Sequence, residues 1–145
     1  MRLDMDCVRD VLLCVEENTG LHQSCYFLDL KYTEAMDFLG DITEVPVYQQ
    51  NLQEIYNNET LFYHVRYCME AGLISTIPET AAYLLAVADL TPSGHDLLNK
   101  IRDTDRWRGI KKALPAIRNY SLDAISSLSQ GMTSGAISAY LEKGH

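Results

Sequence analysis

The sequence contains no long hydrophobic run and few basic residues, and each shortage excludes a class of protein. No stretch approaches the roughly 18 apolar residues of a membrane-spanning helix, so we expect no membrane association. Twelve Lys and Arg stand against twenty Asp and Glu, and the net charge of −8 disfavours a nucleic-acid binder that relies on bulk positive charge. A hydrophobic fraction of 47% with eight glycines and four prolines excludes a disordered or collagen-like chain.

The patterns of common catalytic and metal sites are also missing. The chain has no glycine-rich phosphate loop, no H-E-x-x-H, no nucleophile elbow and no C-x-x-C, and its four histidines lack metal-ligand spacing. We therefore expect a protein that is not an enzyme and holds neither a metal nor another cofactor. The acidic N-terminus is unlike a signal peptide, and we expect reduced, unpaired thiols in the cytoplasm. The four cysteines are Cys7, Cys14, Cys25 and Cys68.

Charge is distributed unevenly along the chain. Residues 1–94 contain 4 Lys and Arg against 15 Asp and Glu, a net charge of −11, whereas residues 95–118 contain 7 against 3, a net charge of +4. The basic segment either complements the acidic body of the same molecule or attracts an anionic partner, and the sequence leaves both open. The candidate contacts for an anion or a nucleic acid are Arg106, Arg108, Lys111 and Lys112.

Two segments in the first half have the apolar periodicity of helices. One covers about residues 7–18, with Asp4 or Asp6 as its N-cap and Gly20 as a left-handed stop. The other is 58–71, the strongest helix of the chain. Its expected core stripe consists of Leu61, Phe62, Val65, Cys68 and Met69.

A third helix begins at Thr91, whose hydroxyl can cap the chain ahead of a proline in the first turn. Its apolar positions continue past Trp107 to Leu114, and we expect Pro115 to end it. We expect the rings of Trp107 and Phe62 to be buried, so that alanine at either position destabilises the fold by roughly 3–5 kcal/mol.

The strands are shorter and less regular. Residues 24–32 have strand composition, 44–48 form a candidate edge strand around a proline, and 73–77 and 82–88 flank a turn and should pair as an antiparallel ribbon. Short helices are predicted at 33–39 and 49–56. This order of elements predicts an α+β, winged-helix-like domain over residues 1–118, mostly helical with a two- to three-stranded ribbon.

Three blocks of sequence resemble a known family. They are MRLDMDCVRDVLLCVEEN at 1–18, ETLFYHVRYCMEAGLI at 59–74 and LTPSGHDLLNKIRDTDRWRGIKKAL at 90–114. In this order they are similar to the bacterial and phage family known as domain of unknown function 2513. The resemblance implies a winged-helix-like fold and a bacterial or phage origin, and it implies no mechanism. The chain departs from the family pattern by a longer segment at about 21–47.

The charges disfavour DNA recognition by the expected recognition helix and wing. Arg66 is the only Lys or Arg between residues 58 and 94, which also contain four carboxylates, so this surface would repel a duplex. Tyrosine and arginine are instead enriched at protein interfaces. The candidate surface consists of Tyr63, His64, Arg66 and Tyr67. Either it binds a protein partner or the segment 21–47 covers it.

The C-terminal residues 119–145 form a helical appendage in this interpretation. Apolar residues recur at helical spacing through 121–141, and the helix either packs on its own domain or pairs with a second copy. We expect a homodimer, because an exposed apolar stripe of this size is a liability on a monomer. The sequence as a whole predicts a small cytoplasmic interaction or regulatory module that binds a protein partner. The alternative is a DNA-binding transcriptional regulator of the winged-helix type.

Overall fold

The computed structural model describes residues 1–32, 44–78, 83–117 and 122–131. These residues belong to two compact units, which divide the chain after His95. The expected boundary between residues 118 and 119 lies outside the described residues and stays a prediction. Within the described part of the chain, no helix has the length and apolar composition needed to cross a membrane.

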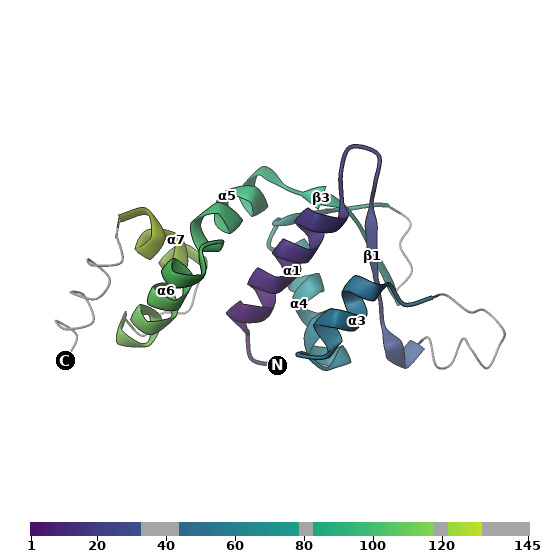
Figure 1. Ribbon diagram of the computed structural model, residues 1–145, viewed down its shortest axis with the longest axis horizontal. Coiled ribbons are helices and arrows are strands. Elements are labelled where there is room, and N and C mark those ends of the chain that lie inside the picture. Colours follow the sequence, from purple (N-terminus) through teal and green to yellow (C-terminus); the bar gives the residue numbers. More distant parts are fainter. Residues whose placement is uncertain (33–43, 79–82, 118–121, 132–145) are drawn as a thin grey trace. The chain divides into compact units, whose positions relative to one another are not determined.

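The first unit is an α+β arrangement in which helices pack against a three-stranded antiparallel sheet (Figure 1). Its elements are α1 (Met5–Asn18), β1 (Cys25–Leu28), α3 (Val47–Gln53), α4 (Asn58–Glu70), β2 (Ile74–Thr76) and β3 (Leu84–Leu90). The sheet order is β1-β3-β2, so β2 and β3 form the wing and β1 closes against the returning strand. This confirms the predicted α+β, winged-helix-like fold and the predicted pairing of the ribbon.

The core of this unit forms where the inner face of the sheet meets the helices. Alternate strand residues are buried, and Phe27 and Val87 are no more than 1% exposed. The apolar stripe of α1 is fully buried and contacts β3 and α4. That stripe consists of Cys7, Val8, Val11, Leu12 and Val15.

The ends of α1 are capped by side chains. Asp4 accepts hydrogen bonds from the backbone N–H groups of Asp6 and Cys7, as predicted for an N-cap. The predicted stop at Gly20 is wrong, because Thr19 leaves the helix in an extended conformation and Gly20 has no positive φ. The Thr19 hydroxyl instead donates to a carbonyl of the last turn. Left-handed glycine is found at Gly72, with a φ of 73°, just after α4.

The buried stripe of α4 is rotated from the predicted one. Leu61, Val65 and Cys68 are buried as expected, but Phe62 is half-buried, so the prediction that its ring belongs to the core is wrong. Met69 is half-buried as well. His64 is fully buried on the core side of α4, where neither Phe62 nor Met69 is. Its burial leaves no polar atom unsatisfied, because both ring nitrogens have backbone hydrogen-bond partners.

A helix, and not the predicted edge strand at 44–48, lies beside β1. α3 begins at Val47 and covers the outer edge of the sheet with its own side chains. The hydroxyl of Tyr48 accepts from the N–H of Tyr26 (2.8 Å) and donates to its carbonyl (2.6 Å), and the amide of Gln49 does the same for Leu28 (2.8 and 2.7 Å). The strand is also shorter than the predicted 24–32, and the predicted helix at 33–39 lies outside the described residues.

The predicted third helix is two helices. α5 covers Pro92–Ile101, and α6 covers Thr104–Ile117. Asp103 starts α6 by accepting from the N–H of Arg106 at 2.7 Å, a cap that the uninterrupted apolar periodicity conceals. The expected stop at Pro115 is wrong, because the helical backbone continues to Ile117. Trp107 is 3% exposed, as predicted for a core ring.

In the second unit, α7 (Leu122–Gly131) packs against α6. Ala124, Ile125 and Leu128 are buried, and the hydroxyl of Ser129 donates to the carbonyl of Lys100 at 3.1 Å. The described part of the predicted helix 121–141 therefore packs on its own chain. Residues 132–141 lie outside the described residues, and the homodimer stays a prediction.

Candidate functional site

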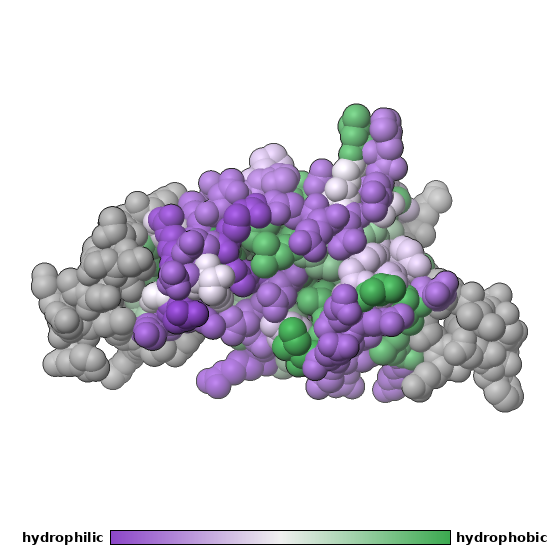
Figure 2. Space-filling model, in the orientation of Figure 1, coloured by the Kyte–Doolittle hydropathy of each residue, from purple (hydrophilic) through white to green (hydrophobic). Residues whose placement is uncertain are grey.

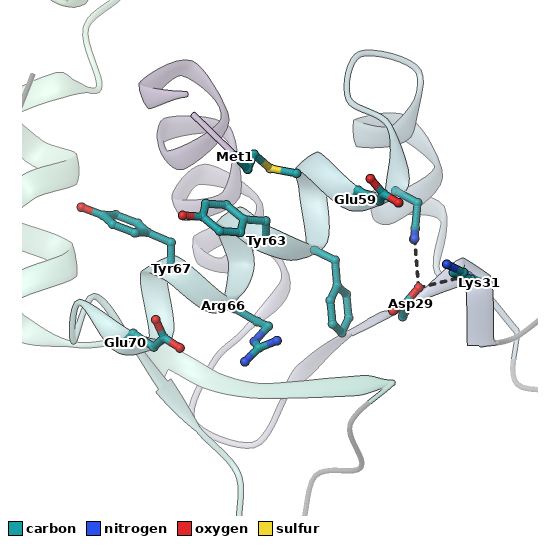
Figure 3. Close-up of a pocket in the computed structure, with 10 residues that line it drawn as sticks. Met1, Asp29, Lys31, Glu59, Tyr63, Arg66, Tyr67 and Glu70 are labelled. Carbon is teal, nitrogen blue, oxygen red and sulfur yellow. Dashed lines mark hydrogen bonds between the residues drawn. The ribbon is translucent and has the colours of Figure 1, made fainter. Parts of the chain in front are cut away.

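The outer face of α4 is the position that a winged helix normally presents to DNA. Here it presents two tyrosines and one arginine of the predicted surface. Tyr63 is 42% exposed, Arg66 is exposed and Tyr67 is half-buried. In the close-up of Figure 3, these three side chains project from the helix together with Glu70.

His64, the fourth predicted surface residue, does not lie on this face. Its Nε2 accepts from the N–H of Asp4 at 2.8 Å, and its Nδ1 lies 2.7 Å from the carbonyl of Thr60. A neutral ring that carries its proton on Nδ1 satisfies both partners, so the pairing assigns this tautomer. His64 thus joins α4 to the start of α1, and its ring packs edge-on against Tyr63 at 5.2 Å between centroids.

A cavity of about 470 Å³ opens beside this face. That volume lies in the range of about 300–1,000 Å³ that is typical of ligand pockets. The sequence predicted only three of its lining residues. The lining consists of Met1, Asp29, Lys31, Asn58, Glu59, Phe62, Tyr63, Arg66, Tyr67 and Glu70.

The rim of the cavity is built by hydrogen bonds between the end of β1 and the start of α4. The side chain of Asn58 accepts from the N–H of Leu30 at 2.8 Å and donates to the carboxylate of Asp29 at 2.9 Å. The same carboxylate oxygen of Asp29 accepts from the N–H of Lys31 at 3.0 Å. The sequence offers no signal for this contact, because Asp29 and Asn58 are far apart in the chain and each alone resembles an ordinary turn or cap residue.

The cavity carries mixed charge on aromatic walls. Its cations are Lys31 and Arg66, and its carboxylates are Asp29, Glu59 and Glu70. Burial, followed by the proximity of Cys68 and Tyr63, raises the pKa of Tyr67 and keeps its phenol neutral. The neutral Tyr67 phenol can therefore take part in hydrogen bonds, and the face also offers charged groups and aromatic ring faces.

The segment 21–47 borders this face and does not cover it in the described residues. Asp29 and Lys31 lie on the cavity rim, while Tyr63 and Arg66 remain exposed. Figure 2 shows exposed apolar groups on one face of the molecule scattered among hydrophilic ones, without a single large hydrophobic patch. On the face that Figure 2 shows, this mixture favours polar and aromatic recognition over purely hydrophobic docking.

The thiols of the described chain are poor nucleophiles. All four cysteines are free and buried in the structure. Burial raises the pKa of Cys25 and of Cys68 to about 12, so both thiols are neutral at physiological pH. Among the described residues, no group of three or more His, Cys, Asp and Glu is placed to hold a metal ion.

The four predicted anion contacts on α6 differ in their availability. Arg106 donates to the carbonyl of Ser129 in α7, and Lys111 lies 5.9 Å from the centre of the Trp107 ring. Arg108 is exposed and makes one long contact of 3.4 Å with Asp105, and Lys112 is exposed. Arg106 therefore contributes to helix packing, and the other three remain near the surface of α6.

Comparisons with known proteins agree with the suggested family. A family model described as hypothetical protein (DUF2513) matches residues 2–119. A protein from Haemophilus influenzae, described as uncharacterized, is 33% identical over 82 residues, which cover 54% of this chain and 70% of that protein. No solved structure matches the chain.

Proposed function

We infer a binding role for this chain, which belongs to the DUF2513 family of hypothetical proteins. It acts as a non-catalytic interaction or regulatory module that binds a protein partner through the outer face of α4. The observation that carries this proposal is the cavity beside Tyr63, Arg66 and Tyr67. Tyrosine and arginine dominate the energetics of protein interfaces, and here they flank a concave surface that a partner side chain can fill.

The same surface is poorly suited to DNA. Phosphate contacts supply most non-specific DNA affinity, and a reading helix needs cations to make them. α4 carries one arginine between two exposed glutamates, Glu59 and Glu70. A duplex placed there would meet more negative charge than positive.

We place the protein in the bacterial cytoplasm. Its thiols are free, as expected in a reducing compartment, and the Haemophilus relative supports a bacterial origin. The alternative function is a DNA-binding regulator that uses the second unit. Two observations favour it, namely the winged-helix-like fold and the exposed Arg108 and Lys112 of α6.

Site-specific photo-crosslinking in the organism that carries the gene tests the proposal. A benzophenone amino acid at Tyr63 should yield a protein adduct, and the same group at the exposed Gln50 of α3 should not. Arg66→Ala in the same chain should abolish the adduct, because the arginine lies in the centre of the face. A nuclease-sensitive adduct at Tyr63 would show that the face contacts DNA and would overturn the proposal.

A further inference from the structure

We propose that the occupant of the α4 face is a basic segment of the partner protein, with two cationic side chains that flank a central non-basic residue. This inference rests on the proposed function and names the chemistry of its partner. The cationic groups pair with Glu59 and Glu70, and an acidic or neutral residue between them faces Arg66 beside the cavity.

The charge of the surrounding unit favours a basic partner. Residues 1–94 have a net charge of −11, so a positively charged segment is attracted before contact. Within the face, Asp29 is already engaged by Asn58 and by the N–H of Lys31. Glu59 and Glu70 are exposed, and among the described residues no ion pair or side-chain hydrogen bond engages either of them.

The spacing of charges along α4 defines the required pattern. Glu59, Arg66 and Glu70 are separated by seven and four residues, so at about 100° per residue they lie within about 40° of one line along the helix. Glu59 and Glu70 are then roughly 16 Å apart at about 1.5 Å per residue. The face presents a minus–plus–minus stripe, and its complement is a plus–minus–plus segment or one with a neutral centre. Arg66 thereby rejects a uniformly basic chain.

Aromatic side chains supply the rest of the recognition. Tyr63 and Tyr67 flank Arg66 on the same helix, and their ring faces attract Lys or Arg groups that sit beside the carboxylates. The edge-on contact between Tyr63 and the buried His64 holds the Tyr63 ring before any partner arrives. Such preorganisation reduces the entropy lost on binding.

Fluorescence anisotropy with synthetic peptides tests the pattern. The first probe is a labelled helical peptide of about 15 residues with two Lys about 16 Å apart and a central Glu, and the second is its charge-reversed counterpart. The third is a labelled duplex DNA. We expect the plus–minus–plus peptide to bind about tenfold more tightly than the charge-reversed peptide at low salt, and the difference to shrink at high salt.

A matched pair of double variants distinguishes direct pairing with Glu59 and Glu70 from attraction by the net negative charge of the protein. Glu59→Lys/Glu70→Lys should reverse the preference between the two peptides. Glu17→Lys/Glu54→Lys changes the net charge equally at exposed carboxylates of α1 and of the α3 terminus, and should keep the preference. Circular dichroism and urea unfolding check that each variant is folded.

The outcomes distinguish this inference from the proposed function. The inference would be overturned if both double variants lost affinity for the plus–minus–plus peptide equally. It would also be overturned if the parent protein bound the charge-reversed peptide more tightly, or bound neither peptide. In each case a protein adduct at Tyr63 would leave the proposed function standing. DNA binding that Arg66→Ala removes would overturn the proposed function as well.

Discussion

At the scale of single residues, His64 shows how a polar side chain can occupy a core position. The ring is fully buried, and its two nitrogens pair with the N–H of Asp4 and the carbonyl of Thr60. Sequence periodicity placed this residue on the polar face of α4, because a histidine that is satisfied by backbone groups has the same spacing as one that faces water. The error follows from a contact across sixty residues, which no local pattern encodes.

Replacing His64 by alanine should destabilise the first unit by about 2–4 kcal/mol, because it opens a cavity and leaves the N–H of Asp4 without its acceptor. Urea unfolding followed by circular dichroism measures the loss. Tyr63→Ala on the same turn is the control and should cost much less, since that ring is 42% exposed. A His64→Ala protein with the wild-type midpoint would contradict the structural role.

The buried thiols predict an alkaline loss of stability. Burial raises the pKa of Cys25 and of Cys68 to about 12, whereas the unfolded thiols titrate near about 8.5. Above that pH the unfolded state binds fewer protons than the folded state, so the free energy of unfolding falls as pH rises. The stabilisation is complete below about pH 8 and is lost at up to about 1.4 kcal/mol per pH unit for each thiol.

Urea midpoints measured between about pH 7 and pH 11 test this sign. Cys25→Ala should shift the midpoint at neutral pH and also flatten its decline at alkaline pH, because one titrating group is removed. A decline with the same slope in the variant and the parent would show that this thiol does not contribute.

At the scale of elements, the predictable features are those with local signals. The periodicity of α1 and α4, the glycine after α4 and the two apolar runs of the ribbon all predicted elements that the structure contains. The predicted edge strand at 44–48 is wrong because Val-Pro-Val-Tyr has the composition of a strand, whereas Tyr48 and Gln49 reach the sheet edge from a helix. The break between α5 and α6 was hidden because the apolar spacing continues across it.

The Gln49 side chain joins α3 to the edge strand β1. Gln49→Ala removes both hydrogen bonds to the backbone of Leu28 and should destabilise the first unit by about 2–3 kcal/mol. Asn51→Ala, an exposed position on the same helix, should change stability by less than about 0.5 kcal/mol. Equal unfolding midpoints for the two variants would refute the role assigned to Gln49.

The first turn of α5 tolerates no side chain at Gly94. A Cβ there would lie 2.0 Å from the carbonyl oxygen of Leu73, which also accepts from the N–H of Thr91. Gly94→Ala should therefore destabilise the protein by about 2–4 kcal/mol through displacement of the helix start. Ser93→Ala, at an exposed neighbour, serves as the control. Thermal unfolding of both variants gives the comparison.

At the scale of the whole molecule, the order of elements was enough to predict the winged-helix-like fold, because composition and spacing identify α1, α4, the ribbon of β2 and β3, and the start of α5. The candidate site was predicted only in part. Tyr63, Arg66 and Tyr67 share one helix and could be found together, whereas Asp29, Lys31 and Asn58 reach the cavity only through tertiary pairing. Phe62 was assigned to the core because an aromatic residue at helical spacing gives the same signal in either place.

The charge distribution predicts where DNA would bind if it binds. Replacing Arg108, Lys111 and Lys112 with glutamine should abolish any binding to random duplex DNA and flatten its salt dependence, whereas Arg66→Ala should change little. Titration of labelled DNA at two salt concentrations measures both effects. Loss of sequence-specific binding in Arg66→Ala, with the triple variant unaffected, would restore an ordinary DNA-reading winged helix.

The outward peptide groups of Tyr26 and Leu28 already have partners, and those partners are side chains. A strand from a neighbouring molecule finds no free donor or acceptor along this stretch, so the sheet cannot grow from β1 by adding strands. Polymerisation through this edge requires α3 to detach first. We therefore expect no sheet growth from the β1 edge while α3 is in place, and thioflavin-positive aggregates that use this edge to appear only in variants that release α3.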